Sequence, residues 1–450
     1  MKIVHGFFAL WMAAAVALEA QDVSLTVYNQ DLALVREIRT MTLKAGVSTV
    51  SFTGVSERID PTSVHFQSLT TPKKAVILEQ NFEYDLVNAG KILEKYVDQD
   101  VRLVTEKGEL FEGTLLSASG GDIVIQTREG KVQIIRPEKV QNFDFPKLPD
   151  GLITRPTLVW LVKNDGPEIH KTEIRYLTEG INWHAEYVAI TDSLDKNLDL
   201  SGWVSIDNRS GATYPNATLK LVAGDIHRVE PPVPLTTYRA DMAMAKAEAA
   251  PQFEEESFFE YHLYTLLRSA TIKNNQIKQL SLFPSVRTKS QKIFLFDGAQ
   301  SDKKVRVYVE FRNSTKEGLG LPLPKGKIRV YKQDRGGALE FVGEDQLDHT
   351  PVDEKVRILL GNAFDCVGER ISKAVRKLSD RSREEEIVVS LRNHKETAVD
   401  MVVVEHLWGD WKITKSSHEY KTKDSRTVEW SVPVPARGET MVSFTVLTRW

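Results

Sequence analysis

The densest group of side chains that could do chemistry lies between residues 343 and 351. This segment reads Gly-Glu-Asp-Gln-Leu-Asp-His-Thr-Pro and contains Glu344, Asp345 and His349. Carboxylates beside an imidazole could bind a hard cation or transfer protons. The segment follows an expected strand, and we expect it to form a turn, where Asp and Thr side chains often satisfy nearby backbone groups. A capped turn is the favoured interpretation, and Glu344, Asp345 and His349 are the candidate binding residues if a ligand binds there.

The sequence lacks the compact motifs that identify most catalytic or cofactor sites. It has no H-E-x-x-H zinc helix, no G-x-x-x-x-G-K-[ST] phosphate loop and no G-x-S-x-G elbow. The single cysteine, Cys366, excludes both an intramolecular disulfide and a C-x-x-C pair. Its apolar neighbours favour a buried thiol over a nucleophile. We therefore predict no metal, no cofactor and no catalytic residue, although triads assembled from distant segments leave no such motif.

The tryptophans allow two interpretations. Exposed aromatic side chains offer rigid contact area to a glycan or a peptide, whereas buried ones fill a sandwich core. Core packing is the favoured interpretation for the five that lie within or beside expected strands: Trp183, Trp203, Trp408, Trp411 and Trp430.

The N-terminus has the features of a secretory signal peptide. Lys2 supplies positive charge, residues 7–18 form an uncharged apolar run, and small residues follow, with Ala15 and Ala17 or Ala20 as cleavage sites. The run is too short to span a bilayer as a helix, and no later run is long enough. We expect a mature chain that begins near Gln21 and resides in the bacterial periplasm or outside the cell, without a transmembrane span.

Most of the chain alternates apolar and polar residues with a period of two, which predicts half-buried strands. Residues 23–28, 305–310 and 442–447 are clear examples, and turns rich in Gly, Asn, Asp and Pro separate such runs. The predicted fold class is mainly β, with several antiparallel β-sandwich-like domains and a small SH3-like or Sm-like barrel insert.

Composition shifts divide the chain into six expected segments. They are a signal peptide (1–20), an N-terminal β segment (21–90), the barrel insert (91–146), a central β domain (147–235), a flexible linker rich in Ala, Met and Glu (236–257) and a C-terminal β-sandwich domain (258–450). A partner-binding amphipathic segment is the alternative for the linker.

Several segments resemble the DUF4139 family of uncharacterised bacterial proteins, which includes mucoidy-inhibitor-like members. The resemblance rests on residues 27–39 (VYNQDLALVREIR), 202–226 (GWVSIDNRSGATYPNATLKLVAGDI), 260–266, 321–334 (LPLPKGKIRVYKQD), 341–351 and 391–411. It implies a β-rich exported protein and supplies no mechanism. Larger members carry a coiled-coil-like insertion where this chain has its small module, so no partner of such helices is expected.

These observations favour a non-enzymatic interaction or scaffold protein of the cell envelope. The partner would be a protein or a glycan, and the formal net charge of -3 gives no indication of nucleic-acid binding. Two alternatives remain: an envelope hydrolase with a carboxylate and histidine site, and a surface-assembly subunit that polymerises through exposed strand edges.

Overall fold

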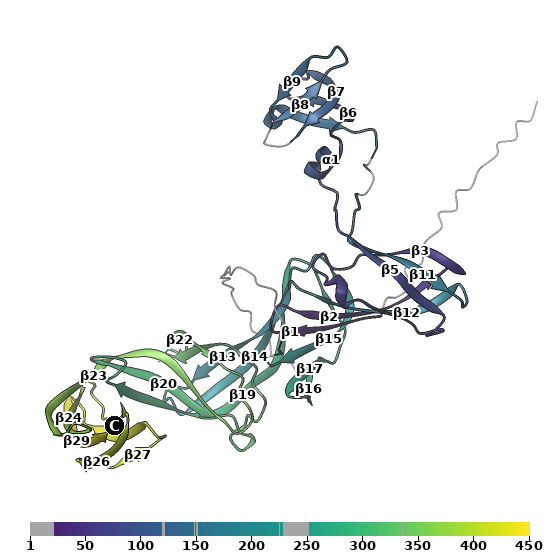
Figure 1. The fold of residues 1–450 in the computed structure, drawn as a ribbon. Coiled ribbons are helices and arrows are strands. Elements are labelled where there is room, and N and C mark those ends of the chain that lie inside the picture. The colour runs from purple at the N-terminus through teal and green to yellow at the C-terminus, as the bar shows by residue number, and fades with distance from the viewer. Residues whose placement is uncertain are drawn as a thin grey trace, which may run out of the picture.

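The structure is a computed structural model that describes residues 22–118, 122–147, 149, 152–224, 226–227, 252–334 and 336–450. The chain folds almost entirely into β-strands arranged in four sheets, so the predicted mainly β fold class with several sandwich-like sheets is confirmed (Figure 1). The expected signal peptide and residues 236–251 of the expected linker lie outside the described residues. None of the helices described is both long and apolar enough to cross a membrane.

The first sheet combines strands from widely separated parts of the sequence. Its order is β16-β17-β15-β1-β2-β12-β4, with β18 paired to β15. Its strands are β1 (Asp22–Tyr28), β2 (Ala33–Thr42), β4 (His65–Ser68), β12 (Ile169–Thr178), β15 (Tyr214–Ala223), β16 (Phe253–Phe258), β17 (Tyr261–Leu266) and β18 (Ala270–Ile272). Strands from four expected segments therefore share one sheet. The range expected to be linker already contains β16, because its backbone pairs with β17.

A three-stranded sheet, β3-β11-β5, extends this part of the molecule. It consists of β3 (Gly46–Thr53), β5 (Ala75–Glu83) and β11 (Thr157–Asn164). Trp160 on its central strand is fully buried and stacks on Phe52 with ring centroids 5.5 Å apart.

A small module extends away from the rest of the chain (Figure 1). It begins with α1 (Ala89–Lys95) and continues with β6 (Asp100–Thr105), β7 (Leu110–Ser117), β8 (Ile123–Gln126), β9 (Val132–Ile135) and β10 (Val140–Asp144). The sheet order is β10-β6-β7-β8-β9, and no pairing between the outer strands β9 and β10 is found in the described part. The barrel expected for residues 91–146 is thus a five-stranded sheet with its own small core.

The fourth sheet has 13 strands and runs through the C-terminal half. Its strands are β13 (Ile181–Thr191), β14 (Asn197–Asn208), β19 (Gln276–Asp297), β20 (Lys304–Arg312), β21 (Gly326–Gln333), β22 (Leu339–Leu347), β23 (Lys355–Ser379), β24 (Ser382–Asn393), β25 (Val399–His406), β26 (Asp410–Ser416), β27 (Tyr420–Thr422), β28 (Thr427–Val434) and β29 (Gly438–Arg449). The main path is β22-β21-β13-β14-β19-β20-β23-β24-β29-β26.

Two large cores lie along this sheet, and the long strands β19 and β23 take part in both. The first half of β19 pairs with β14, whereas its second half pairs with β20 and β25. Accordingly, Phe283 packs in the first core and Phe296 in the second. The sandwich-core interpretation is right for Trp183 and Trp430, which are buried, whereas Trp203 is half-buried and Trp408 is 46% exposed.

Candidate binding site

Two of the three residues predicted from the sequence lie within a strand and not in a turn. Glu344 and Asp345 belong to β22, which pairs along its length with β21, so the expected turn at these residues was wrong. The backbone groups of Glu344 and Asp345 therefore pair with strand β21, a long-range pairing that the sequence pattern could not show. Glu344 lies opposite Arg329, and its carboxylate is 3.5 Å from the Arg329 Nε and 3.6 Å from the Lys327 Nζ.

Asp345 and His349 contact different partners from those of Glu344. Asp345 Oδ2 accepts a hydrogen bond of 2.7 Å from the backbone N–H of Leu359, which joins β22 to β23. His349 Nδ1 accepts from the backbone N–H of Lys325 at 3.2 Å, and its Nε2 lies 3.4 Å from Asn29 Nδ2. Adjacent strand residues face opposite sides of a sheet, so Glu344 and Asp345 point apart. The structure therefore does not bring the three side chains together, although each contacts other groups.

Other groups with possible chemistry are engaged structurally. Cys366 is buried as expected, and burial raises the pKa of its thiol, which reduces the thiolate available as a nucleophile. His262 Nδ1 lies 2.7 Å from Glu255 Oε1. Within the described ranges, no group of three or more His, Cys, Asp and Glu side chains could hold a metal ion.

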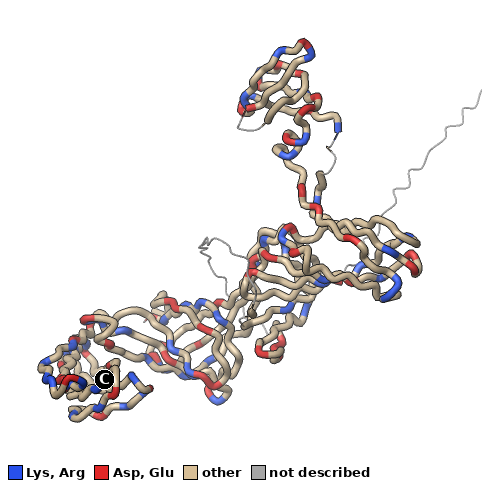
Figure 2. Tube along the Cα trace, viewed as in Figure 1, with Lys and Arg blue, Asp and Glu red and all other residues tan. Residues whose placement is uncertain are grey.

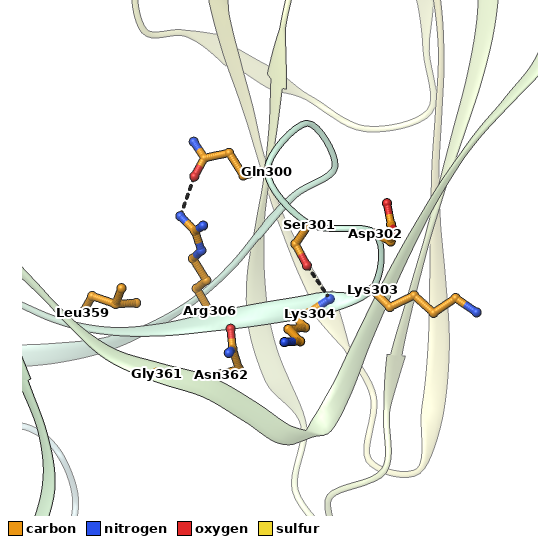
Figure 3. A pocket seen from close by; sticks show the side chains of 9 residues that line it. All are labelled: Gln300, Ser301, Asp302, Lys303, Lys304, Arg306, Leu359, Gly361 and Asn362. Carbon is orange, nitrogen blue, oxygen red and sulfur yellow. Dashed lines mark hydrogen bonds between the residues drawn. The ribbon is translucent and has the colours of Figure 1, made fainter.

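A hollow on the described surface lies where the turn after β19 enters β20. It has a volume of about 610 Å³. Figure 3 shows Arg306 turned toward Gln300, whose side-chain oxygen accepts a hydrogen bond from the guanidinium. The nine lining residues include three cations and one carboxylate: Gln300, Ser301, Asp302, Lys303, Lys304, Arg306, Leu359, Gly361 and Asn362.

The three cations of this hollow outnumber the one carboxylate in its lining, Asp302. Across the described part of the chain, Lys303, Lys304 and Arg306 form no ion pair. The tight turn that precedes them is held by Ser301 Oγ, which accepts a hydrogen bond of 3.0 Å from the backbone N–H of Lys304. Such a set of guanidinium, ammonium and amide donors is suited to an anionic, hydroxyl-bearing ligand.

A second hollow of about 210 Å³ adjoins the first and shares Gln300 and Arg306 with it. His406 lies at this hollow with its Nε2 3.0 Å from Asp297 Oδ2. Asp297 is buried and also accepts a hydrogen bond of 3.0 Å from the backbone N–H of Ala299. The Asp297 carboxylate therefore fixes the orientation of the His406 imidazole and holds the turn that begins at Asp297. Both groups lie in the same hollow as Arg306.

Sequence reasoning did not select Lys303, Lys304 or Arg306. The signal was present in residues 297–308, where a turn sequence (DGAQSD) leads into a strand that begins with alternating cations (KKVRVY). What the sequence could not show is that Asn362 and Leu359 of β23 close the hollow from the neighbouring strand.

Comparison with models of known protein families finds no match, and a search of curated proteins finds no relative. The DUF4139 resemblance therefore stays a prediction. The fold and the hollow define the class: a mainly β protein of several sheets with a hollow lined by three cations on its 13-stranded sheet.

Proposed function

We propose that this chain is an exported, non-enzymatic interaction protein of the bacterial cell envelope. It presents the surfaces of several β-sheet units to a protein or glycan partner. The observation that carries the proposal is the arrangement of the sheets: two large cores extend along one long body, and a small module with its own core extends away from it (Figure 1). Such a shape exposes several separate surfaces to partners.

The surfaces themselves have features of contact sites. On β9, an outer strand of the module, Val132 and Ile134 are 57% and 69% exposed, and alternate apolar side chains on an outer strand are typical contact residues. The exposed Trp408 packs on Trp450 at a centroid distance of 5.2 Å. Lys and Arg residues are interspersed with Asp and Glu along the described part of the trace (Figure 2).

The export part of the proposal is tested by N-terminal sequencing of protein recovered from a periplasmic extract. We expect a chain that begins at or near Gln21. Recovery of intact Met1 in the cytosolic fraction would contradict export.

The interaction part is tested by photo-crosslinking in intact cells. A photoreactive amino acid replaces Ile134 or Trp408 in separate variants, and mass spectrometry identifies the captured molecules. We expect discrete adducts with envelope components from at least one exposed position. A matched variant at the buried Leu103 serves as control and should give no intermolecular adduct. Absence of adducts from both exposed positions would count against a contact role for these surfaces.

A further inference from the structure

Strand β20 presents a row of polar side chains on the face opposite the cores. Val305 packs in the second core and Phe311 in the first. Because side chains alternate along a strand, Lys304, Arg306 and Arg312 project to the other face. Neighbouring positions on that face are about 7 Å apart, and Lys304 and Arg312 are about 27 Å apart along the strand.

The adjacent strand β23 adds two more cations to this face. Lys355 lies opposite Arg312, and Arg357 lies opposite Glu310. Glu310 is 5% exposed and accepts hydrogen bonds from the Arg357 guanidinium at 2.8 Å and 3.0 Å and from the Lys355 ammonium at 3.1 Å. Two cations thus share one buried carboxylate, so this part of the face also keeps an excess of positive charge.

The strand has a hollow at each end of the row. The hollow of about 610 Å³ lies beside Lys304, and another of about 310 Å³ lies beside Arg312. Among the described residues Arg312 forms no ion pair, and its Nε donates to the backbone carbonyl of Asp353 at 3.1 Å. Since the whole chain has a formal net charge of -3, this positive face is a local concentration and not a result of overall basicity.

The uncharged side chains on this face indicate the chemistry of the ligand. Amide groups of Gln300 and Asn362 line the hollow beside Lys304, and Gln291 lines the hollow beside Arg312, where they can donate to or accept from hydroxyl groups. Tyr308 is the one aromatic residue that β20 places on this face. Single-stranded nucleic acid is usually held by several stacking aromatic side chains, so the composition favours a sugar polymer.

We propose that the outward face of β20, from Lys304 to Arg312, binds a linear acidic glycan, that is, a chain of sugars that carry carboxylates. The inference rests on the proposed interaction function and assigns one partner class to one face. Carboxylates of the glycan pair with the cations that form no ion pair among the described residues, Lys304, Arg306 and Arg312, while the amide side chains bind sugar hydroxyls in the hollows beside Lys304 and Arg312.

The test measures binding of polygalacturonate to the mature chain by isothermal titration calorimetry in a buffer of low ionic strength. We expect saturable binding that weakens as salt is added, because the contacts are largely ionic. The variant Lys304→Glu/Arg306→Glu should bind about tenfold or more weakly, because two attractive contacts become repulsive. Dextran, a neutral sugar polymer, should not bind measurably.

A matched control variant reverses two other cations. Lys44 and Lys73 are exposed and lie in turns of the N-terminal part, away from β20; Lys44→Glu/Lys73→Glu should bind polygalacturonate like the parent chain. Equal weakening in both variants would show attraction by net charge and overturn the inference. Tighter binding of a single-stranded DNA oligonucleotide than of polygalacturonate would also overturn it.

Two further measurements keep the test decisive. Circular dichroism and thermal unfolding establish that the β20 variant is folded, and the milder Lys304→Gln/Arg306→Gln replaces it if it is not. If photo-crosslinking captures an envelope partner while polygalacturonate does not bind, the proposed function stands and the glycan inference fails.

Discussion

Four buried asparagines hold the turns of this chain in the same way. Each lies at the end of a strand or directly after it, donates from its side-chain amide to backbone carbonyls of two separate segments, and accepts a hydrogen bond from a backbone N–H at its Oδ1. They are Asn164, Asn208, Asn313 and Asn393. An asparagine can make these contacts without a charge, so it stabilises turns that join the layers.

The first prediction concerns Asn393. Its Nδ2 donates to the carbonyls of Thr397 and Pro435 at 2.9 Å and 3.0 Å, and its Oδ1 accepts from the N–H of Lys395 at 3.0 Å. Asn393→Ala leaves these buried groups unpaired, so the free energy of unfolding should fall by about 2–3 kcal/mol. Urea titration followed by tryptophan fluorescence measures it. Asn81→Ala, at an exposed residue, is the control and should change little.

The second prediction concerns the pH dependence at Glu310. Burial alone would raise the pKa of this carboxyl, but hydrogen bonds from Arg357, Lys355 and Gln291 outweigh it and lower the pKa below its ordinary value of 4.5. A lowered pKa in the folded state stabilises the fold above pH 4.5, and this contribution is lost as the pH falls through the folded-state pKa.

The stability difference between the parent chain and Glu310→Gln should therefore be largest near neutral pH and shrink below pH 4.5. Urea titrations at a series of pH values test this. Glu129→Gln, which removes an exposed carboxylate paired with Lys131, should show almost no such trend. If the stability difference between the parent chain and Glu310→Gln did not change with pH, the ion pairs of Glu310 with Lys355 and Arg357 would be contradicted.

At the scale of elements, two glycines allow strands to approach bulky rings. A Cβ at Gly368 of β23 would lie 2.2 Å from the Phe296 ring, and one at Gly202 of β14 would lie 2.4 Å from the Phe283 ring. Neither residue has a positive φ. Space, not backbone conformation, is therefore what requires glycine at these positions.

The third prediction follows from this contact. Gly368→Ala should lower the free energy of unfolding by about 1–3 kcal/mol, because the added methyl group must displace the Phe296 ring. The double variant Gly368→Ala/Phe296→Leu should lose less than the sum of the two single variants, as measured by a double-mutant cycle in urea. Strict additivity would show that the ring is not the obstacle.

At the scale of the whole molecule, the cores differ in how they are connected. The two large cores share β19, β20 and β23. Unfolding of one core would therefore disrupt strands of the other. The module joins the body through the chain near Leu86 and Ile153, which form an isolated bridge. Its sheet pairs with no other sheet in the described part of the chain.

The fourth prediction is that the module unfolds independently. Its core is small, so it should melt at a lower temperature than the body. Replacing residues 89–147 with a short Gly-Ser linker should remove the low-temperature transition in scanning calorimetry and leave the main transition unchanged. Loss of the main transition would show that the module supports the body.

The sequence by itself determined the fold class and many of the strands. Alternation at residues 305–310 and 442–447 predicted β20 and β29, because the period of side chains along a strand is a local property. The burial of Cys366 also followed from its immediate neighbours. Turn residues also marked the short strands of the small module, β6 to β10.

Only the tertiary structure decided which strands are neighbours and therefore where a binding surface forms. Pairing of β1 with β15 joins segments almost 200 residues apart, and no local pattern encodes that choice. The same applies to the candidate sites: Glu344 and Asp345 are close in sequence yet face apart on a strand, whereas Arg306 and Asn362 are distant in sequence and meet across two strands. Side-chain proximity depends on register and long-range pairing, which composition and spacing do not contain.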